Sequence, residues 1–181
     1  DSFVTLDVLS PYKKDNLAFI INPVISAVNS AHAAGYEEGK DLLIAQRTLD
    51  PSMLELNRQG YLNGHTPFSA MVAFATYLTA FVHGRKYITL SNESSANEST
   101  IKGSTVNHQY SKTFEFEQDF HTYSHAYLRD DIMYFSLLRP ISELQITGLF
   151  SRMKDYHPVF RSCNVGSKKG VWCGHCAKCL F

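Results

Sequence analysis

The chain has 181 residues, of which 44% are hydrophobic, and its 17 basic residues balance its 17 acidic residues. This length and composition predict one globular domain with enough apolar surface for a core. The even charge argues against wholesale binding of nucleic acid or of an anionic membrane, and no apolar run approaches the roughly 18 residues that cross a bilayer.

The first ninety residues alternate patterns typical of buried strands and amphipathic helices. Residues 1–9 carry an amphipathic stretch that is compatible with a helix. Residues 17–21 (LAFII) and 42–45 (LLIA) are continuous apolar runs, as in strands that are buried on both faces. Residues 87–90 (YITL) predict a third strand.

Two helices are predicted between these strands. In the first, Asn22 offers an N-cap, Pro23 fits the first helical position and Gly35 is placed to end the helix. The second, over residues 66–84, carries the strongest helical apolar stripe of the chain. The order strand, helix, strand, helix, strand implies parallel pairing with right-handed crossovers, and therefore an α/β fold.

The second half of the chain is less regular. Residues 91–113 are polar and predict a loop at the end of the third strand. A later helix begins at Ser142, where Ser142 and Gln145 match a capping box and Ile141 can pack on Ile146. In open parallel sheets, loops at strand ends line the ligand crevice, so residues 91–113 are the first place to look for a site.

Several polar side chains in and near these loops are candidates for binding. The segment Ser91–Thr100 follows a buried strand directly and carries Asn92, Glu93, Asn97 and Glu98, although residues of these types also form ordinary solvated turns. Three groups could hold an anion or lie on a solvated surface: Asn63, Gly64 and His65 before the long helix; His108, Tyr110, Ser111 and Lys112; and Arg139 before Pro140.

All four cysteines lie near the end of the chain. Two intervening residues separate Cys173 from Cys176 and Cys176 from Cys179, and nine intervening residues separate Cys163 from Cys173. Thiolates this close suit one tetrahedral zinc ion better than two disulfides, which would need an oxidising compartment and a signal segment that the sequence does not show. An iron–sulfur cluster is the main alternative, and His175 could replace one cysteine.

Five segments together resemble a known family. They are NGHTPFSAMVAF, SNESSANEST, VNHQYSKTFEFE, YFSLLRPISELQI and SCN…WCGHCAKCLF, in this order from residue 61 onward. The combination is similar to the ATP-dependent UDP-N-acetylmuramoyl-L-alanyl-L-glutamate epimerase family of peptidoglycan precursor synthesis. More remotely, the chain is similar to PP-loop ATP pyrophosphatases such as 7-cyano-7-deazaguanine synthase, which also carry a cysteine-bound zinc.

The resemblance implies a fold for the chain. It implies an open parallel sheet with helices on both faces, of the adenine nucleotide alpha hydrolase type, closed by a cysteine-rich zinc segment over residues 160–181. DSFVTLDVL then looks like the tail of the phosphate loop and the helix that follows it. The first strand and most of that loop would be missing, so that residues 1–181 form one domain cut at both ends.

The resemblance also implies an activity. The terminal L-glutamate of a nucleotide-linked substrate would be converted to D-glutamate through an acyl-adenylate, with ATP, Mg²⁺ and Zn²⁺ as cofactors, in the cytoplasm and without nucleic acid or membrane. The expected roles are catalysis by Glu93, Glu98 and His108; nucleotide binding by Asp1, Ser2, Asn63, Gly64, His65 and Asn92; and substrate binding by Asn97, Tyr110, Ser111, Lys112 and Arg139.

Two alternatives to this activity stay open at the level of sequence. The chain could be a zinc-stapled binding module without catalysis, or a PP-loop enzyme that acts on another substrate. His65 and His108, together with Glu93 and Glu98, are the candidates for the base that moves the proton.

Overall fold

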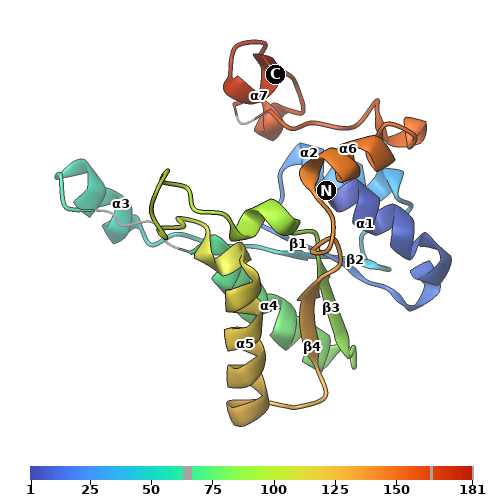
Figure 1. Ribbon diagram of the computed structural model, residues 1–181, viewed down its shortest axis with the longest axis horizontal. Coiled ribbons are helices and arrows are strands. Elements are labelled where there is room, and N and C mark those ends of the chain that lie inside the picture. The colour runs from blue at the N-terminus through green and yellow to red at the C-terminus, as the bar shows by residue number, and fades with distance from the viewer. Residues whose placement is uncertain (63–66, 164, 181) are drawn as a thin grey trace. The chain divides into compact units, whose positions relative to one another are not determined.

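The computed structural model describes residues 1–62, 67–163 and 165–180 (Figure 1). By their contacts, the residues form two compact units. Unit 1 comprises Asp1–Val8 and Pro67–Arg152, and unit 2 comprises Leu9–Thr66 and Met153–Phe181. The α/β class is confirmed, whereas the single domain over residues 1–181 and its PP-loop arrangement stay predictions.

Unit 1 contains a parallel pair of strands covered by helices. Strand β3 (Tyr87–Leu90) pairs with β4 (Met133–Ser136), with Leu90 opposite Ser136 in the register. Helix α4 (Phe68–Val82) contacts β3, and α5 (Phe114–Tyr127) contacts β4 (Figure 1). Their shared core consists of Ala73, Tyr77, Ala80, Ile88, Phe120, Ile132 and Tyr134.

Two further helices of unit 1 lie where the sequence predicts them. Helix α1 (Ser2–Leu9) places Phe3 against Phe150 of α6 (Glu143–Phe150), with 5.7 Å between the ring centroids. The capping box at the start of α6 is confirmed: the Ser142 side chain accepts from the Gln145 N–H, and the Gln145 side chain accepts from the Ser142 N–H. Local polar groups therefore define where α6 begins.

Unit 2 contains the other parallel pair. Strand β1 (Ala18–Ile21) pairs with β2 (Leu42–Ala45), and α2 (Ile25–Ala33) connects them. Short helices follow at α3 (Pro51–Arg58) and α7 (Ala177–Leu180). The predicted strands are confirmed, but the described residues form two separate two-stranded sheets rather than one continuous sheet.

The predicted start of α2 is wrong. The helix begins at Ile25 and its N-cap is Val24, which is extended and makes no side-chain capping bond. Asn22 instead has a φ of 53°, in the left-handed region that asparagine tolerates better than most residues. The chain therefore turns sharply at the end of β1 before the helix starts.

Candidate functional site

A polar cluster lies at the carboxyl ends of β3 and β4. Ser136 is the last residue of β4, and Asn92 follows β3. Because the strands are parallel, these ends meet at one edge, and Asn92 Nδ2 donates a hydrogen bond to Ser136 Oγ at 3.0 Å. Ser136 Oγ in turn donates to the Glu117 carboxylate on α5. The loop after β3, strand β4 and helix α5 thus each contribute a side chain to this cluster.

Arg139 and Glu117 form a buried ion pair in this cluster. Their side chains are only 13% and 7% exposed, and Arg139 Nη2 donates to Glu117 Oε1. The same guanidinium donates from Nη1 to the Glu93 carbonyl at 2.9 Å and from Nη2 to the Lys112 carbonyl at 2.7 Å. Arg139 therefore connects α5 to both parts of the polar loop.

Two buried polar atoms in or beside this cluster have no hydrogen-bond partner within the described residues. They are Nε of Arg139 and Oη of Tyr134 on β4. Burial raises the pKa of Tyr134, and the negative charge of Glu117 raises it further. The phenol is therefore a neutral donor at ordinary pH. Buried donors without acceptors are costly, so the cluster has capacity for an additional acceptor such as water.

The rest of the polar loop is held by short-range hydrogen bonds. Glu93 Oε1 accepts from Ser95 Oγ at 2.7 Å, and His108 Nδ1 bonds to Thr100 Oγ1. Asn97 Oδ1 accepts from the N–H of Phe114 at 2.7 Å, which satisfies one of the free donors at the start of α5. The side chain of Glu98 is solvent-exposed, as is that of His108.

Tyr110 is oriented by a carboxylate. Its hydroxyl donates to Asp119 Oδ2, and this hydrogen bond, with smaller contributions from burial and from the nearby negative charges, raises the pKa of Tyr110 to about 12. The ring of Tyr110 meets Phe116 edge to face, with centroids 6.0 Å apart. Beside it lies a groove of about 350 Å³ lined by Asn97, Thr105, Asn107, Tyr110, Thr113, Phe114, Glu115 and Gln118.

The four cysteines form a second candidate site, in unit 2. Their Sγ atoms all lie within 4.8 Å of one another, with 3.8 Å between Cys163 and Cys176, 3.8 Å between Cys173 and Cys179, and 3.5 Å between Cys176 and Cys179. A tetrahedron of four Zn–S bonds of about 2.3 Å has edges of about 3.8 Å. The donor set therefore fits tetrahedral zinc, while the separations are far from a disulfide bond.

Backbone N–H groups prepare the cysteines for a cation. The N–H of Gly166 and that of Cys173 donate to Cys163 Sγ at 3.0 and 3.4 Å. Burial opposes the charged form of Cys163, but these donors, together with the Cys173 and Cys179 side chains, lower the pKa of its thiol to about 6. Burial and the neighbouring thiols raise the pKa of Cys179 to about 11, so that without a metal the charge is concentrated on Cys163. His175 is not part of the group, and its Nδ1 lies 2.9 Å from the Cys173 carbonyl oxygen.

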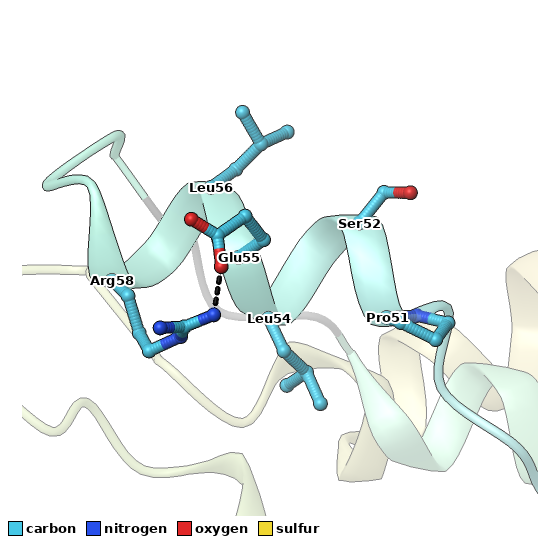
Figure 2. A pocket seen from close by; sticks show the side chains of 6 residues that line it. All are labelled: Pro51, Ser52, Leu54, Glu55, Leu56 and Arg58. Atoms are coloured by element: carbon cyan, nitrogen blue, oxygen red, sulfur yellow. Dashed lines mark hydrogen bonds and ion pairs between the residues drawn. The ribbon is translucent and has the colours of Figure 1, made fainter.

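A hollow along α3 does not resemble a ligand site. It is lined by residues of this one helix: Pro51, Ser52, Leu54, Glu55, Leu56 and Arg58 (Figure 2). Figure 2 shows Leu54 and Leu56 on different sides of the helix, and both side chains are about half exposed. Arg58 pairs with Glu55 of the same helix. The hollow is therefore an open helix surface rather than an enclosed cavity.

The structure brings some of the predicted site residues together. Arg139 touches the backbone of Glu93 and of Lys112, and Asn92 joins the same network. Asp1 and Ser2 lie at the start of α1, where the Asp1 carbonyl accepts from Val4 and Thr5. The predicted Asn63, Gly64 and His65 lie outside the described residues.

Sequence reasoning missed three residues of the site. Glu117, Asp119 and Ser136 hold Arg139, Tyr110 and Asn92 respectively. Two of them stand inside segments that carry the family resemblance, Glu117 in VNHQYSKTFEFE and Ser136 in YFSLLRPISELQI. Ser136 could have been identified from its place at the end of β4, but the sequence did not predict β4.

Comparison with known proteins links the chain to one family. Residues 1–137 match the family model described as the MurL N-terminal domain. A protein of Salinispora tropica named UDP-N-acetyl-alpha-D-muramoyl-L-alanyl-L-glutamate epimerase is 39% identical over 191 aligned residues, covering 100% of this chain and 40% of the relative. Proteins of the same name from Xanthomonas oryzae and a Micromonospora species are 40% and 37% identical and cover 82% and 100% of this chain.

The chain spans about two fifths of the length of these curated relatives, with 40%, 35% and 41% of each relative covered. No solved structure matches the chain. In the part of the chain that the structure describes, no helix is both long and apolar enough to cross a membrane.

Proposed function

The chain belongs to the MurL N-terminal domain family, and on this basis we propose that it forms part of an ATP-dependent epimerase. The enzyme converts the terminal L-glutamate of UDP-N-acetylmuramoyl-L-alanyl-L-glutamate to D-glutamate in the cytoplasm. The observation that carries the proposal is the identity of 37–40% to three proteins named as this epimerase. The polar cluster at the strand ends supports a site in this part of the chain.

The proposed reaction begins with activation of a carboxylate. An oxygen of the glutamate α-carboxylate attacks the α-phosphorus of ATP, and the bond to pyrophosphate breaks. The resulting mixed anhydride no longer carries the carboxylate charge, so that the α proton is far more acidic. A base removes this proton and an acid returns one to the opposite face. Water then hydrolyses the anhydride to the D-glutamate carboxylate and AMP.

We assign the proton transfers to Glu93, Glu98 and His108, which all lie in the polar loop. The support is strongest for Glu93, because Arg139 holds its carbonyl and Ser95 holds its carboxylate. An oriented carboxylate at a strand end suits a general base better than a freely rotating one. The proton-transfer residue closest to the rigid cluster is therefore Glu93.

The remaining roles concern binding. We propose that Asn92, with Asp1, Ser2, Asn63, Gly64 and His65, contacts the nucleotide, and that Asn97, Tyr110, Ser111, Lys112 and Arg139 bind the substrate. Arg139 already donates to two carbonyls and one carboxylate, so its contribution includes the placement of Glu93 and Lys112. Mg²⁺ would neutralise charge on the ATP phosphates.

The metal centre has a structural role in this proposal. Cys163, Cys173, Cys176 and Cys179 supply four protein ligands, which leaves no open position for substrate on a tetrahedral zinc ion. Zinc would connect the segment around Cys163 to the C-terminal turn. No catalytic step depends on it.

The test uses the full-length protein. Incubation with ATP and UDP-N-acetylmuramoyl-L-alanyl-L-glutamate in deuterated water should give AMP, pyrophosphate and a D-glutamyl product with deuterium at Cα. The same substrate without its glutamate is the control and should give no AMP. AMP formation that requires a different acceptor would overturn the proposal, and retained zinc without any ATP consumption would favour the binding module.

Variants identify the base within the same assay. Glu93→Gln should abolish deuterium exchange while the anhydride still forms, because the amide cannot accept the proton. Glu98→Gln and His108→Asn are the matched variants for the other two candidates. If Glu93→Gln exchanges deuterium normally, Glu93 is not the base, and the role belongs to the residue, Glu98 or His108, whose variant loses the exchange.

A further inference from the structure

The groove beside Tyr110 has a lining that differs from an anion site. It lies between the loop that contains Asn97, Thr105 and Asn107 and the first turns of α5. Among its eight lining residues, five are aliphatic with an uncharged amide or hydroxyl group, two are aromatic (Tyr110 and Phe114), and Glu115 is the one charged residue. A negative charge without a cation in the lining disfavours phosphate and carboxylate.

The polar groups of the groove are held in position before any ligand arrives. Asn107 Nδ2 donates to the Ala96 carbonyl at 2.9 Å, and its Oδ1 accepts from the Gln109 N–H at 2.7 Å. Asn97 is fixed in the same way by the Ser94 carbonyl at 3.1 Å and the Phe114 N–H. Each amide keeps one N–H and one lone pair for a ligand, so binding would cost little side-chain entropy.

Two aromatic rings give the groove an apolar surface. Tyr110 and Phe114 are 41% and 49% exposed, so that part of each ring is available for contact. The ring of Tyr110 is held by the hydrogen bond to Asp119 and by edge contact with Phe116. Rigid aromatic faces surrounded by a few fixed polar groups suit a ligand with an apolar face and a polar edge.

We propose that this groove binds the uncharged acetamido sugar ring of the substrate. The C–H face of a sugar ring packs on an aromatic ring, and its hydroxyl and acetamido groups exchange hydrogen bonds with amides and hydroxyls. A volume of about 350 Å³ is at the small end for ligand sites, which suits one ring rather than a whole nucleotide-linked molecule. The inference rests on the proposed function for the identity of the sugar, because the relatives' names contain an N-acetylmuramoyl unit.

The first experiment measures binding directly and does not depend on epimerase activity. Saturation-transfer NMR of the full-length protein with N-acetylglucosamine should show contact at the acetyl methyl and ring protons. Phe114→Ala removes one ring face, and Gln118→Ala removes one lining amide whose side chain forms no hydrogen bond to another described residue. Each should weaken binding about threefold to tenfold, the range for one uncharged contact.

The matched control is Tyr127→Ala, which removes an exposed aromatic residue of the same helix, far along it from the groove. It should bind N-acetylglucosamine as the wild type does. UMP should not compete with the sugar, because the groove offers no cation to a phosphate. Competition by UMP, or absence of saturable binding in the millimolar range, would overturn the assignment.

The second experiment uses the epimerase assay. Phe114→Ala and Gln118→Ala should raise KM for the sugar-linked substrate by the same factor as the loss of sugar binding, with KM for ATP unchanged. If the protein binds the sugar through Phe114 but has no epimerase activity, the groove assignment stands and the proposed function is wrong. If the protein is an active epimerase and both variants behave as wild type, the groove assignment is wrong and the proposed function stands.

Discussion

At the scale of single residues, Arg139 is the side chain on which most of the polar site depends. It is paired with Glu117, and it donates to the carbonyls of Glu93 and Lys112. The sequence predicted an arginine that binds a ligand anion, and that role stays a prediction. What the structure adds is a reason why this arginine is needed even without ligand: it holds two loop segments beside a buried carboxylate.

Replacement of Arg139 should therefore be costly. Arg139→Ala leaves Glu117 buried without its cation, which typically lowers the free energy of unfolding by about 3–5 kcal/mol. Urea denaturation measures the loss. The matched control is Arg129→Ala, because the Arg129 and Asp131 side chains are 51% and 39% exposed and the loss of this pair should be small. Equal losses in the two variants would show that the Arg139 pair is not the buried contact described above.

Tyr110 provides a prediction on pH. Because Asp119 raises its pKa from 10.0 to about 12, the folded state favours the neutral phenol. The stability that Tyr110 contributes is thus fully present below pH 10 and is lost as the pH rises through about 12. The ultraviolet titration of wild type minus Tyr110→Phe should have its midpoint near pH 12, and Asp119→Asn should lower that midpoint. A midpoint unaffected by Asp119→Asn would contradict the hydrogen bond.

At the scale of elements, the sequence predicted helices whose pattern is complete within one segment, and it missed a helix and a strand whose patterns are weak. The stripe of α4 and the capping box of α6 were predicted because both depend on residues within a few positions of one another. Helix α5 and strand β4 were not predicted, although Thr113 caps α5 by accepting from the Phe116 N–H. The exposed face of α5 mixes aromatic and polar residues, so its helical period is weak in the sequence, and β4 is buried by long-range packing against β3 and α5.

The turn that leads into the cysteine cluster depends on one glycine. A Cβ atom at Gly166 would stand 2.2 Å from the Val171 carbonyl oxygen, a backbone atom that cannot move away cheaply. Gly166→Ala should therefore displace the N–H that bonds Cys163 and lower the affinity for zinc, as measured by competition with a chelator. Gly148→Ala in α6 is the matched control: nothing lies within 4 Å of the added atom, and the helix should gain about 0.5–1 kcal/mol. Equal zinc affinity in both variants would contradict the close approach at Gly166.

At the scale of the whole molecule, metal binding and folding should be linked in unit 2. A site assembled from Cys163 and a C-terminal turn hardly exists in the unfolded chain, so that the free energy of metal binding contributes to folding. We expect one zinc per chain by metal analysis and a lower melting temperature after treatment with a strong chelator.

Two variants test the ligand set. Cys173→Ser should lose the metal, whereas His175→Ala should keep it, because His175 lies outside the group of four thiols. Bound iron with visible absorbance would instead support the iron–sulfur cluster. Metal content that survives Cys173→Ser would show that the four cysteines do not act as one site.

The sequence by itself determined the features that depend on neighbouring residues. These are the α/β class, most strands and helices of the first half, the helix start at Ser142, the polar loop after β3 and the close spacing of three cysteines. Each results from periodicity, capping or ligand spacing within a few positions, and such interactions can be recognised before the chain is folded.

Only the tertiary structure decided which of these features meet. The contacts of Arg139 with Glu117, of Asn92 with Ser136 and of Cys163 with Cys176 join residues that are 22, 44 and 13 positions apart. The first two contacts depend on the register of β3 with β4 and on the packing of α5 against β4, and the burial of the Arg139–Glu117 pair makes either charge costly to leave unpaired. The polar site and the groove beside Tyr110 are therefore products of packing, whereas the loop that contributes to both was visible in the sequence.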